Sequence, residues 1–416
     1  MVTNANTETT LNALHKEIYA DSIEELIPDG VKLIKKVKFA ASDKELGDQY
    51  IMPAMLAHEA GFSYGSGVFT LNDPVEAKYQ EAQVNGKALL LRSAISYSAA
   101  ARMSSGGKKS FIKWTEMIYS NLINSMSKRL EIQSLYGESD NGIGRIDGAP
   151  VVTTNAVMTL ATAEWAAGIW AGSEGSELDA YDTTGATQRN TNAALVIEAV
   201  DLDARTVEVS GNAADLAALA DTDVLWFRGS KGAQGNGVDK ILTNTGTLYN
   251  IDASAFNLWQ GSTFSAGSAD LTFEKVNGAI AKAVEKGLEE KVCTFVSPKT
   301  WTNLQADQAA LRRYPDAAGS RDAKMGPESI TYYGQNGVNE IIPSIYIKEG
   351  EAFVLPEAQC KRIGSTDMTM NLPGSNDRIW LQLPQQAGYE VRCFTEQNFF
   401  IEAPAKAVKI TGIVNS

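Results

Sequence analysis

The sequence has only two histidines and three cysteines in 416 residues, which limits the chemistry that it can perform. His15 and His58 do not lie near a nucleophile motif, and they are typical of surface or contact histidines. Cys293, Cys360 and Cys393 are far apart and odd in number. We therefore expect small buried side chains in a reducing compartment, and neither a disulfide framework nor a zinc site. The sequence predicts no catalytic residue, no cofactor and no metal ion.

Long apolar runs and excess positive charge are also missing. No run of about 18 apolar residues occurs, so we predict no transmembrane helix and no membrane partner. The first ten residues, MVTNANTETT, combine no basic cluster with an apolar stretch, and we expect no signal peptide there. Lys and Arg number 37 against 50 Asp and Glu, a net charge of −13. Nucleic-acid binding is therefore not expected as the main task, although a local basic face remains open.

Known catalytic and binding motifs are absent as well. The string SSGGKKS (104–110) fails the spacing of a phosphate-binding loop, and a flexible basic hinge fits it better. GAQGNG (232–237) and NGIGRIDG (141–148) read as turns. His58-Glu59 has no second histidine at zincin spacing. The pairs Asp201/Asp203 and Asp221/Asp223 are typical of solvated turns, and no EF-hand loop is present.

The chain is long enough for two to three domains, and its first part has the features of an arm. Residues 1–45 form a polar tail, then a short helical pattern, then the turn Pro28-Asp29-Gly30. In VKLIKKVKF (31–39) the apolar residues favour an extended strand over a helix. The segment is too short and polar to fold alone, which predicts an N-terminal arm that lies on a neighbour.

Residues 46–98 predict a projecting β loop. Two apolar runs, QYIMPAML (49–56) and KALLLRSAISY (87–97), flank about 30 residues rich in Gly, Asn and Pro, too many for a tight hairpin. The connection is expected to have its own strand pairing. Exposed strand edges promote aggregation, so such a loop is kept where a partner covers it.

The strongest local prediction is a long helix over 110–136. Its apolar residues recur three and four positions apart, with Ser110 as the expected N-cap and Gly137 as the residue after the helix. At full length such a helix measures roughly 40 Å and can organise other elements around it. Its apolar residues are Phe111, Trp114, Ile118, Leu122, Met126 and Leu130.

Residues 151–270 predict an acidic, β-rich insertion. They contain 15 acidic and 5 basic residues, a net charge of −10. Strands are expected within 194–211 and 223–230. The insertion would separate residues 99–150 from the rest of the chain.

Residues 271–370 predict a compact two-layer α/β unit. We expect helices over 273–291 and 299–313, a buried strand over 292–298, and a hairpin over 340–356 around Glu349-Gly350. Three strand-like runs follow in 378–413 and need a helix to pack on. The helix over 110–136 is the candidate, so residues 99–150 and 371–416 would share one peripheral domain.

One basic stretch stands out against the acidic background. Residues 87–136 contain eight basic and two acidic residues, a net charge of +6. This fits a solvated helix face and loop, or a face that meets a polyanion through weak, salt-sensitive contacts while the acidic insertion faces the other way. The candidate polyanion-facing residues are Arg102, Lys108, Lys109, Lys113, Lys128 and Arg129.

The order of these parts resembles the major capsid proteins of tailed phages. GDQYIMPAMLAHEAGFSYG (47–65) and AQVNGKALLLRSAISYSAAARM (82–103) resemble the two sides of that family's extended loop. KRLEIQSLYG (128–137) and NGIGRI (141–146) resemble its spine helix and exit. KVCTFVSPKTWTNL (291–304) and EAFVLPEAQCKRIG (351–364) resemble its axial domain. The resemblance covers residues 10 to 410, and the acidic insertion departs from the minimal family pattern.

The resemblance implies an α+β chain with the Hong Kong 97 fold and no enzymatic activity. It implies pentamers and hexamers of this chain in an icosahedral head around double-stranded DNA, with a scaffolding protein, a portal and a decoration protein as further partners. The location would be the virion, after assembly in the host cytoplasm. An encapsulin-like shell and a carbohydrate-binding or hydrolytic β-rich protein are the alternatives.

Overall fold

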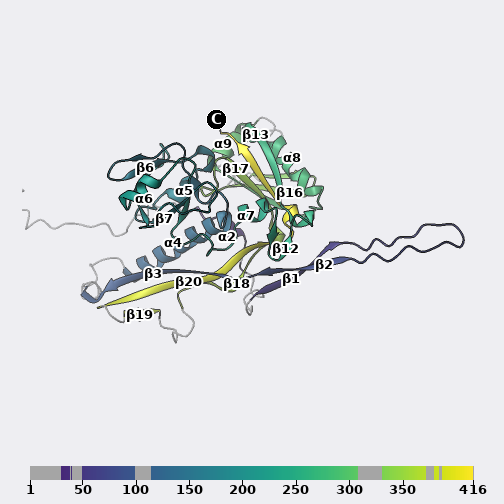
Figure 1. Ribbon diagram of the computed structural model, residues 1–416, viewed down its shortest axis with the longest axis horizontal. Coiled ribbons are helices and arrows are strands. Elements are labelled where there is room, and N and C mark those ends of the chain that lie inside the picture. Colours follow the sequence, from purple (N-terminus) through teal and green to yellow (C-terminus); the bar gives the residue numbers. More distant parts are fainter. Residues whose placement is uncertain are drawn as a thin grey trace, which may run out of the picture.

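The computed structural model describes residues 30–37, 39, 49–98, 114–307, 330–371, 379–383 and 387–415. A long helix, α4 (Trp114–Tyr136), runs over one face of a four-stranded sheet, and the two larger sheets lie beyond the helix (Figure 1). The central strand of the four is β20 (Gly388–Ile401). It pairs on one side with β3 (Lys87–Ser96), and on the other with β18 (Cys360–Thr369) and β19 (Trp380–Gln382). Strands from the first and last thirds of the chain therefore share one sheet with α4.

Helix α4 confirms the predicted apolar stripe. Leu122, Met126 and Leu130 are buried. From Leu130 to Tyr136 nearly every side chain is buried, because the helix is covered on several sides there. The predicted N-cap Ser110 lies outside the described residues. Gly137 follows the helix directly, as expected. None of the described helices is both long and apolar enough to cross a bilayer.

The projecting β ribbon is built from β1 (Tyr50–Ala57) and β2 (Lys78–Val84), paired antiparallel. It extends away from the body of the subunit (Figure 1). The apolar run over 87–97 is a strand, as predicted, but it is β3 and pairs with β20. The partner of β1 is β2, whose sequence KYQEAQV has too few apolar residues to stand out as a strand.

A seven-stranded sheet uses residues 144–227, in the order β4-β10-β7-β8-β9-β6-β5. The strands expected in 194–211 and 223–230 are present as β8, β9 and β10. The strands are β4 (Gly144–Arg145), β5 (Val151–Val152), β6 (Ala156–Thr159), β7 (Glu177–Tyr181), β8 (Leu195–Asp201), β9 (Thr206–Ser210) and β10 (Val224–Phe227). The short helices beside it are η3 (Thr162–Glu164), α5 (Ala167–Trp170) and α6 (Ala213–Ala218).

A six-stranded mixed sheet has the order β13-β21-β17-β14-β16-β15, with α8 (Phe273–Val284) and α9 (Pro298–Ala306). Its strands are β13 (Ser262–Ala269), β14 (Val292–Val296), β15 (Ile330–Gly334), β16 (Gly337–Pro343), β17 (Glu351–Pro356) and β21 (Val408–Ile413). Strand β13 falls in 151–270 by sequence, yet it pairs with β21. The remaining elements are α7 (Val238–Thr243), β11 (Thr247–Leu248), β12 (Ile251–Asp252), η4 (Asn257–Trp259), η5 (Glu357–Gln359) and η6 (Pro404–Lys406).

The hairpin predicted over 340–356 was wrong. Both of its strands exist as β16 and β17, but β14 lies between them, parallel to β16 and antiparallel to β17. Strand β14, VCTFV, is buried at every position, and a strand apolar on both faces takes the centre of a sheet. The connection over 344–350 therefore crosses β14 instead of forming a tight turn.

The extended segment predicted over 31–39 was also wrong in part. Leu33–Lys36 form one helical turn, α2, and Phe39 makes an isolated parallel bridge to Arg362. The three cysteines are buried and unpaired, as expected. Burial raises the pKa of Cys293 to about 12, which keeps it a thiol at neutral pH.

Candidate assembly surfaces

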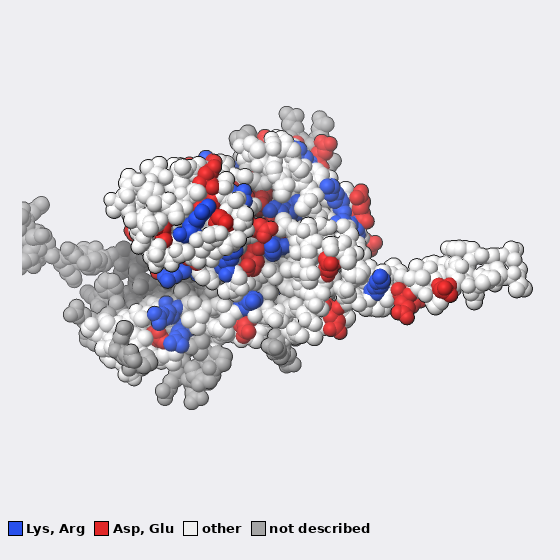
Figure 2. Space-filling model, in the orientation of Figure 1, with Lys and Arg blue, Asp and Glu red and all other residues white. Residues whose placement is uncertain are grey.

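The outer part of the β ribbon exposes apolar side chains without charged ones. Phe62 is 68% exposed and Tyr64 is 88% exposed, and residues 62–72 contain no Lys, Arg, Asp or Glu. Figure 2 shows the ribbon as a mostly uncharged finger, with its few charged residues in the half nearer the body. Exposed apolar patches of this kind mark interaction sites in soluble proteins. The exposed apolar residues of the connection are Phe62, Tyr64, Val68, Phe69, Leu71 and Val75.

Internal hydrogen bonds shape this tip. The backbone N–H of Asn72 donates to Ser63 Oγ at 2.7 Å, and Asn72 Nδ2 donates to the carbonyl oxygen of Phe62 at 2.7 Å. Nearer the body, Ala60 N donates to the carbonyl oxygen of Val75 at 3.2 Å. These bonds join the two sides of the connection. The apolar side chains are therefore presented on a defined scaffold.

The base of the ribbon is anchored to the body through Phe400 of β20. Tyr50 packs its ring edge-on to Phe400, with 6.2 Å between ring centroids, and Tyr249 does the same at 5.4 Å. Alternate residues of β1 face this cluster because side chains on a strand alternate between its two faces. The anchor fixes the direction in which the ribbon leaves the subunit.

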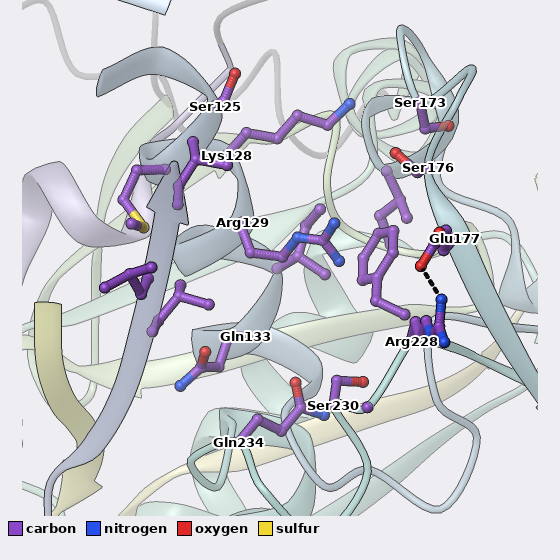
Figure 3. A pocket seen from close by; sticks show the side chains of 18 of the residues that line it. Ser125, Lys128, Arg129, Gln133, Ser173, Ser176, Glu177, Arg228, Ser230 and Gln234 are labelled. Carbon is purple, nitrogen blue, oxygen red and sulfur yellow. Dashed lines mark hydrogen bonds and ion pairs between the residues drawn. The ribbon is translucent and has the colours of Figure 1, made fainter. Parts of the chain in front are cut away.

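Of the six predicted basic residues, the structure brings Lys128 and Arg129 together, at a cleft of about 590 Å³. The cleft lies between α4, β3 and the loops that precede β7 and follow β10 (Figure 3). Arg102, Lys108, Lys109 and Lys113 lie outside the described residues.

Lys128 and Arg129 make contacts within the subunit. The Arg129 guanidinium lies over the ring of Phe227, 3.2 Å from its centroid, and burial lowers the pKa of Arg129 to about 10. Lys128 Nζ donates to the carbonyl oxygen of Ala171 at 2.5 Å, and burial, followed by the Arg129 charge, lowers its pKa to about 8. Both cations thus hold residues 144–227, the seven-stranded sheet unit, against α4. At the rim of the cleft, Arg228 pairs with Glu177 at 2.6 Å.

Helix α4 also holds the start of the described chain. The carboxylate of Glu131 accepts hydrogen bonds from the backbone N–H groups of Lys32, Leu33 and Ile34 at 3.0, 2.8 and 2.9 Å. Burial raises the pKa of Glu131, although the three N–H donors favour its charged form. This carboxylate satisfies N–H groups that a helical turn leaves free, and the predicted extended segment therefore becomes helical.

A buried charge cluster links the six-stranded sheet to α7 and to the seven-stranded sheet. Lys409 on β21 contacts Asp239 on α7 and Glu351 on β17, the latter at 2.5 Å. Lys348 contacts Glu164 at 2.5 Å and donates to the carbonyl oxygen of Gly142 at 3.1 Å. Sequence reasoning missed this cluster. Its one available signal was Lys409 in the middle of the apolar run AVKITGIV (407–414).

Neither a protein-family model nor a curated protein sequence matches the chain. Solved structures do match, at low identity. The Cyanophage A-1(L) capsid asymmetric unit aligns with a TM-score of 0.57 and 10% identity over 98% of this chain and 99% of that chain. The capsid of the native GTA particle aligns with a TM-score of 0.53 and 8% identity over 99% and 100%. The capsid of the empty GTA particle aligns with a TM-score of 0.54 and 8% identity over 99% of this chain and 100% of that chain. The chain therefore has the fold of these capsid subunits, the Hong Kong 97 fold.

Proposed function

We propose that this chain is the major capsid protein of a tailed phage, a structural subunit without enzymatic activity that assembles into the icosahedral head around double-stranded DNA. The observation that carries the proposal is the apolar, uncharged ribbon tip on a subunit with a capsid fold. An isolated subunit leaves this surface exposed to water. Packing it on further copies of the same chain removes the apolar area and the free strand edges from solvent.

The proposal is tested by imaging the expressed chain by negative-stain electron microscopy, alone and with candidate scaffolding proteins. Closed shells of uniform size support it. The test variant is Val68→Asp with Leu71→Asp, because both side chains are exposed in the subunit and contribute nothing to its core. The variant should fold like the wild type by circular dichroism and should fail to form shells.

Leu202→Asp is the matched control. Leu202 is an exposed apolar side chain in the turn between β8 and β9, far from the ribbon, and its change should leave shell yield unchanged. Wild-type chain that remains a monomer with every scaffold tested would overturn the proposal. Shells that contain a protein cargo and no DNA would instead favour the encapsulin-like alternative.

The proposal for DNA contact now rests on the basic segment before α4. Arg102, Lys108, Lys109 and Lys113 give this segment four positive charges, whereas Lys128 and Arg129 are engaged within the subunit. Changing the four to Gln should reduce packaged DNA and the salt sensitivity of the particles. Arg92→Gln with Lys87→Gln is the control, since it also removes positive charge. Equal losses in both variants would mean that net charge, and not this segment, is responsible.

Further partners and the location follow from the same proposal. A scaffolding protein, a portal and a decoration protein would act with the shell, which would form in the host cytoplasm and remain in the virion. We propose that residues 144–227, the span of the seven-stranded sheet, are the inserted unit. With its acidic character, this unit would face away from the DNA.

A further inference from the structure

The arrangement of Lys409, Asp239 and Glu351 points to a chemical modification inside the subunit. We propose that Lys409 and Asp239 condense to an amide, an intramolecular cross-link between β21 and α7, with Glu351 as the proton-transferring residue. The bond would lie within one chain and does not depend on the proposed function.

The fold places the three groups in one buried site. Strands β17 and β21 pair antiparallel with Glu351 opposite Thr411, so Glu351 and Lys409 are diagonal neighbours on the same face. Helix α7 packs on this face and supplies Asp239. Lys409 Nζ lies in contact with a carboxylate oxygen of each acid, at 2.5 Å for Glu351. The amine is therefore held beside the carboxyl carbon that it would attack, which replaces an encounter in solution by a fixed approach.

Water is excluded from this site. The side chains of Lys409, Asp239 and Glu351 are only 5%, 4% and 8% exposed. Charged groups are costly in such surroundings, and an amide carries no charge. Condensation removes one positive and one negative charge from the interior. Exclusion of water also slows the reverse reaction, hydrolysis of the amide.

Glu351 has the properties of a proton carrier. Its Oε1 contacts Lys409, whereas its Oε2 is buried and has no hydrogen-bond partner among the described residues. Burial, followed by the nearby Asp239 charge, raises the pKa of Glu351 to about 7, so the acid form is populated at neutral pH. Ser139 Oγ donates to the other oxygen of Asp239 and holds that carboxyl group in place.

The reaction balances without an oxidant or a co-reactant. Burial lowers the pKa of Lys409, but the two carboxylates raise it further, so Nζ starts as an ammonium and must first pass a proton to the Asp239 carboxylate. The free amine then attacks Cγ of Asp239 and a C–N bond forms. Glu351 donates a proton to the departing oxygen and recovers one from Nζ. The Cγ–O bond breaks, and one water molecule leaves.

Intact-mass spectrometry of the denatured full-length chain tests the proposal. The wild type should weigh less than its sequence by the mass of one water molecule, and a tryptic digest should contain a peptide with position 239 joined to one with position 409. Glu351→Gln, Asp239→Ala and Lys409→Arg should each have the full sequence mass. The second buried pair, Lys348 and Glu164, serves as an internal control, because its peptides should remain separate.

The wild-type measurement needs no variant and therefore does not depend on whether a variant folds. A wild-type mass equal to the sequence mass overturns the cross-link. Loss of water in Glu351→Gln overturns the role of Glu351. Loss of water located between other residues also overturns the proposal.

Discussion

The carboxylate of Glu131 caps the helical turn that begins at Leu33, with Leu33 N donating to Glu131 Oε1 at 2.8 Å. Two residues nearly a hundred positions apart thereby fix the position of α2 on α4. In a capsid subunit this junction would set the direction of the N-terminal arm.

Replacing this carboxylate should release the junction. In Glu131→Ala three backbone N–H groups lose their acceptor, which should cost about 1–3 kcal/mol of unfolding free energy. The released segment should then be cleaved faster by trypsin at the exposed Lys32 and Lys35. Limited proteolysis with mass spectrometry of the fragments measures the effect. Glu138→Gln is the control, because Glu138 accepts a hydrogen bond from only one backbone N–H group among the described residues, that of Gly232, at 2.8 Å. Equal cleavage rates in wild type and Glu131→Ala would contradict the capping role.

The contact of Arg129 with Phe227 should contribute to the docking of the seven-stranded sheet unit on α4. Arg129→Met keeps most of the packing volume and removes the charge over the ring. We expect a loss of about 1 kcal/mol in unfolding free energy and faster amide exchange in β10. Urea unfolding and hydrogen exchange measure these effects.

Arg228→Gln is the matched control for this prediction. Arg228 also sits at the cleft, but it is more than half exposed and pairs with exposed Glu177, and such pairs contribute about 0–1 kcal/mol. Its exchange pattern should match the wild type. If Arg228→Gln had the larger effect, the cation–ring contact would not be what holds the unit.

Local patterns in the sequence predicted the elements whose residues carry their own periodicity. Leu122, Met126 and Leu130 mark α4, and the buried strand over 292–298 was correctly located for the same reason. Strand β2 was missed because KYQEAQV has no such pattern. It is a strand because β1 pairs with it.

Pairing between distant segments could not be read from local patterns. The hairpin over 340–356 has two correct strands and a wrong connection, because the central place of β14 depends on packing against both sheet faces. The cluster of Asp239, Glu351 and Lys409 has no motif, since its members come from three separate elements. Lys128 and Arg129 were selected by charge alone, and their contacts with Ala171 and Phe227 depend on how the unit docks.

Gly137 should tolerate no side chain, for a reason other than the left-handed backbone often found after a helix. A Cβ there would lie 2.1 Å from the carbonyl oxygen of Gly235 and 2.5 Å from that of Gln133. Gly237 N donates to Gly137 O at 2.7 Å, so the two backbones cannot separate cheaply. Gly137→Ala should cost about 3 kcal/mol in unfolding free energy.

Gly246→Ala is the control for steric crowding. A Cβ at Gly246 meets nothing within 4 Å, and its backbone is not in the left-handed region. Its unfolding free energy, measured in urea, should stay within about 0.5–1 kcal/mol of the wild type. Similar losses in the two variants would show that the close approach at Gly137 is unimportant.

The stability of the subunit should depend on pH through Glu351. Because burial raises its folded pKa to about 7 from an ordinary value of 4.5, the folded chain binds this proton more tightly than the unfolded chain. The resulting stability is complete below the ordinary value and is lost as the pH rises through about 7. Glu351→Gln stays neutral at every pH. Relative to this variant, the unfolding free energy of the wild type should therefore fall by an amount on the order of 3 kcal/mol between about pH 5 and 8. Thermal unfolding at a series of pH values measures this as a lower Tm.

Glu402→Gln, which removes a surface partner of Lys361, is the control and should keep the wild-type pH profile. A constant difference between wild type and Glu351→Gln across this range would exclude Glu351 as the titrating group.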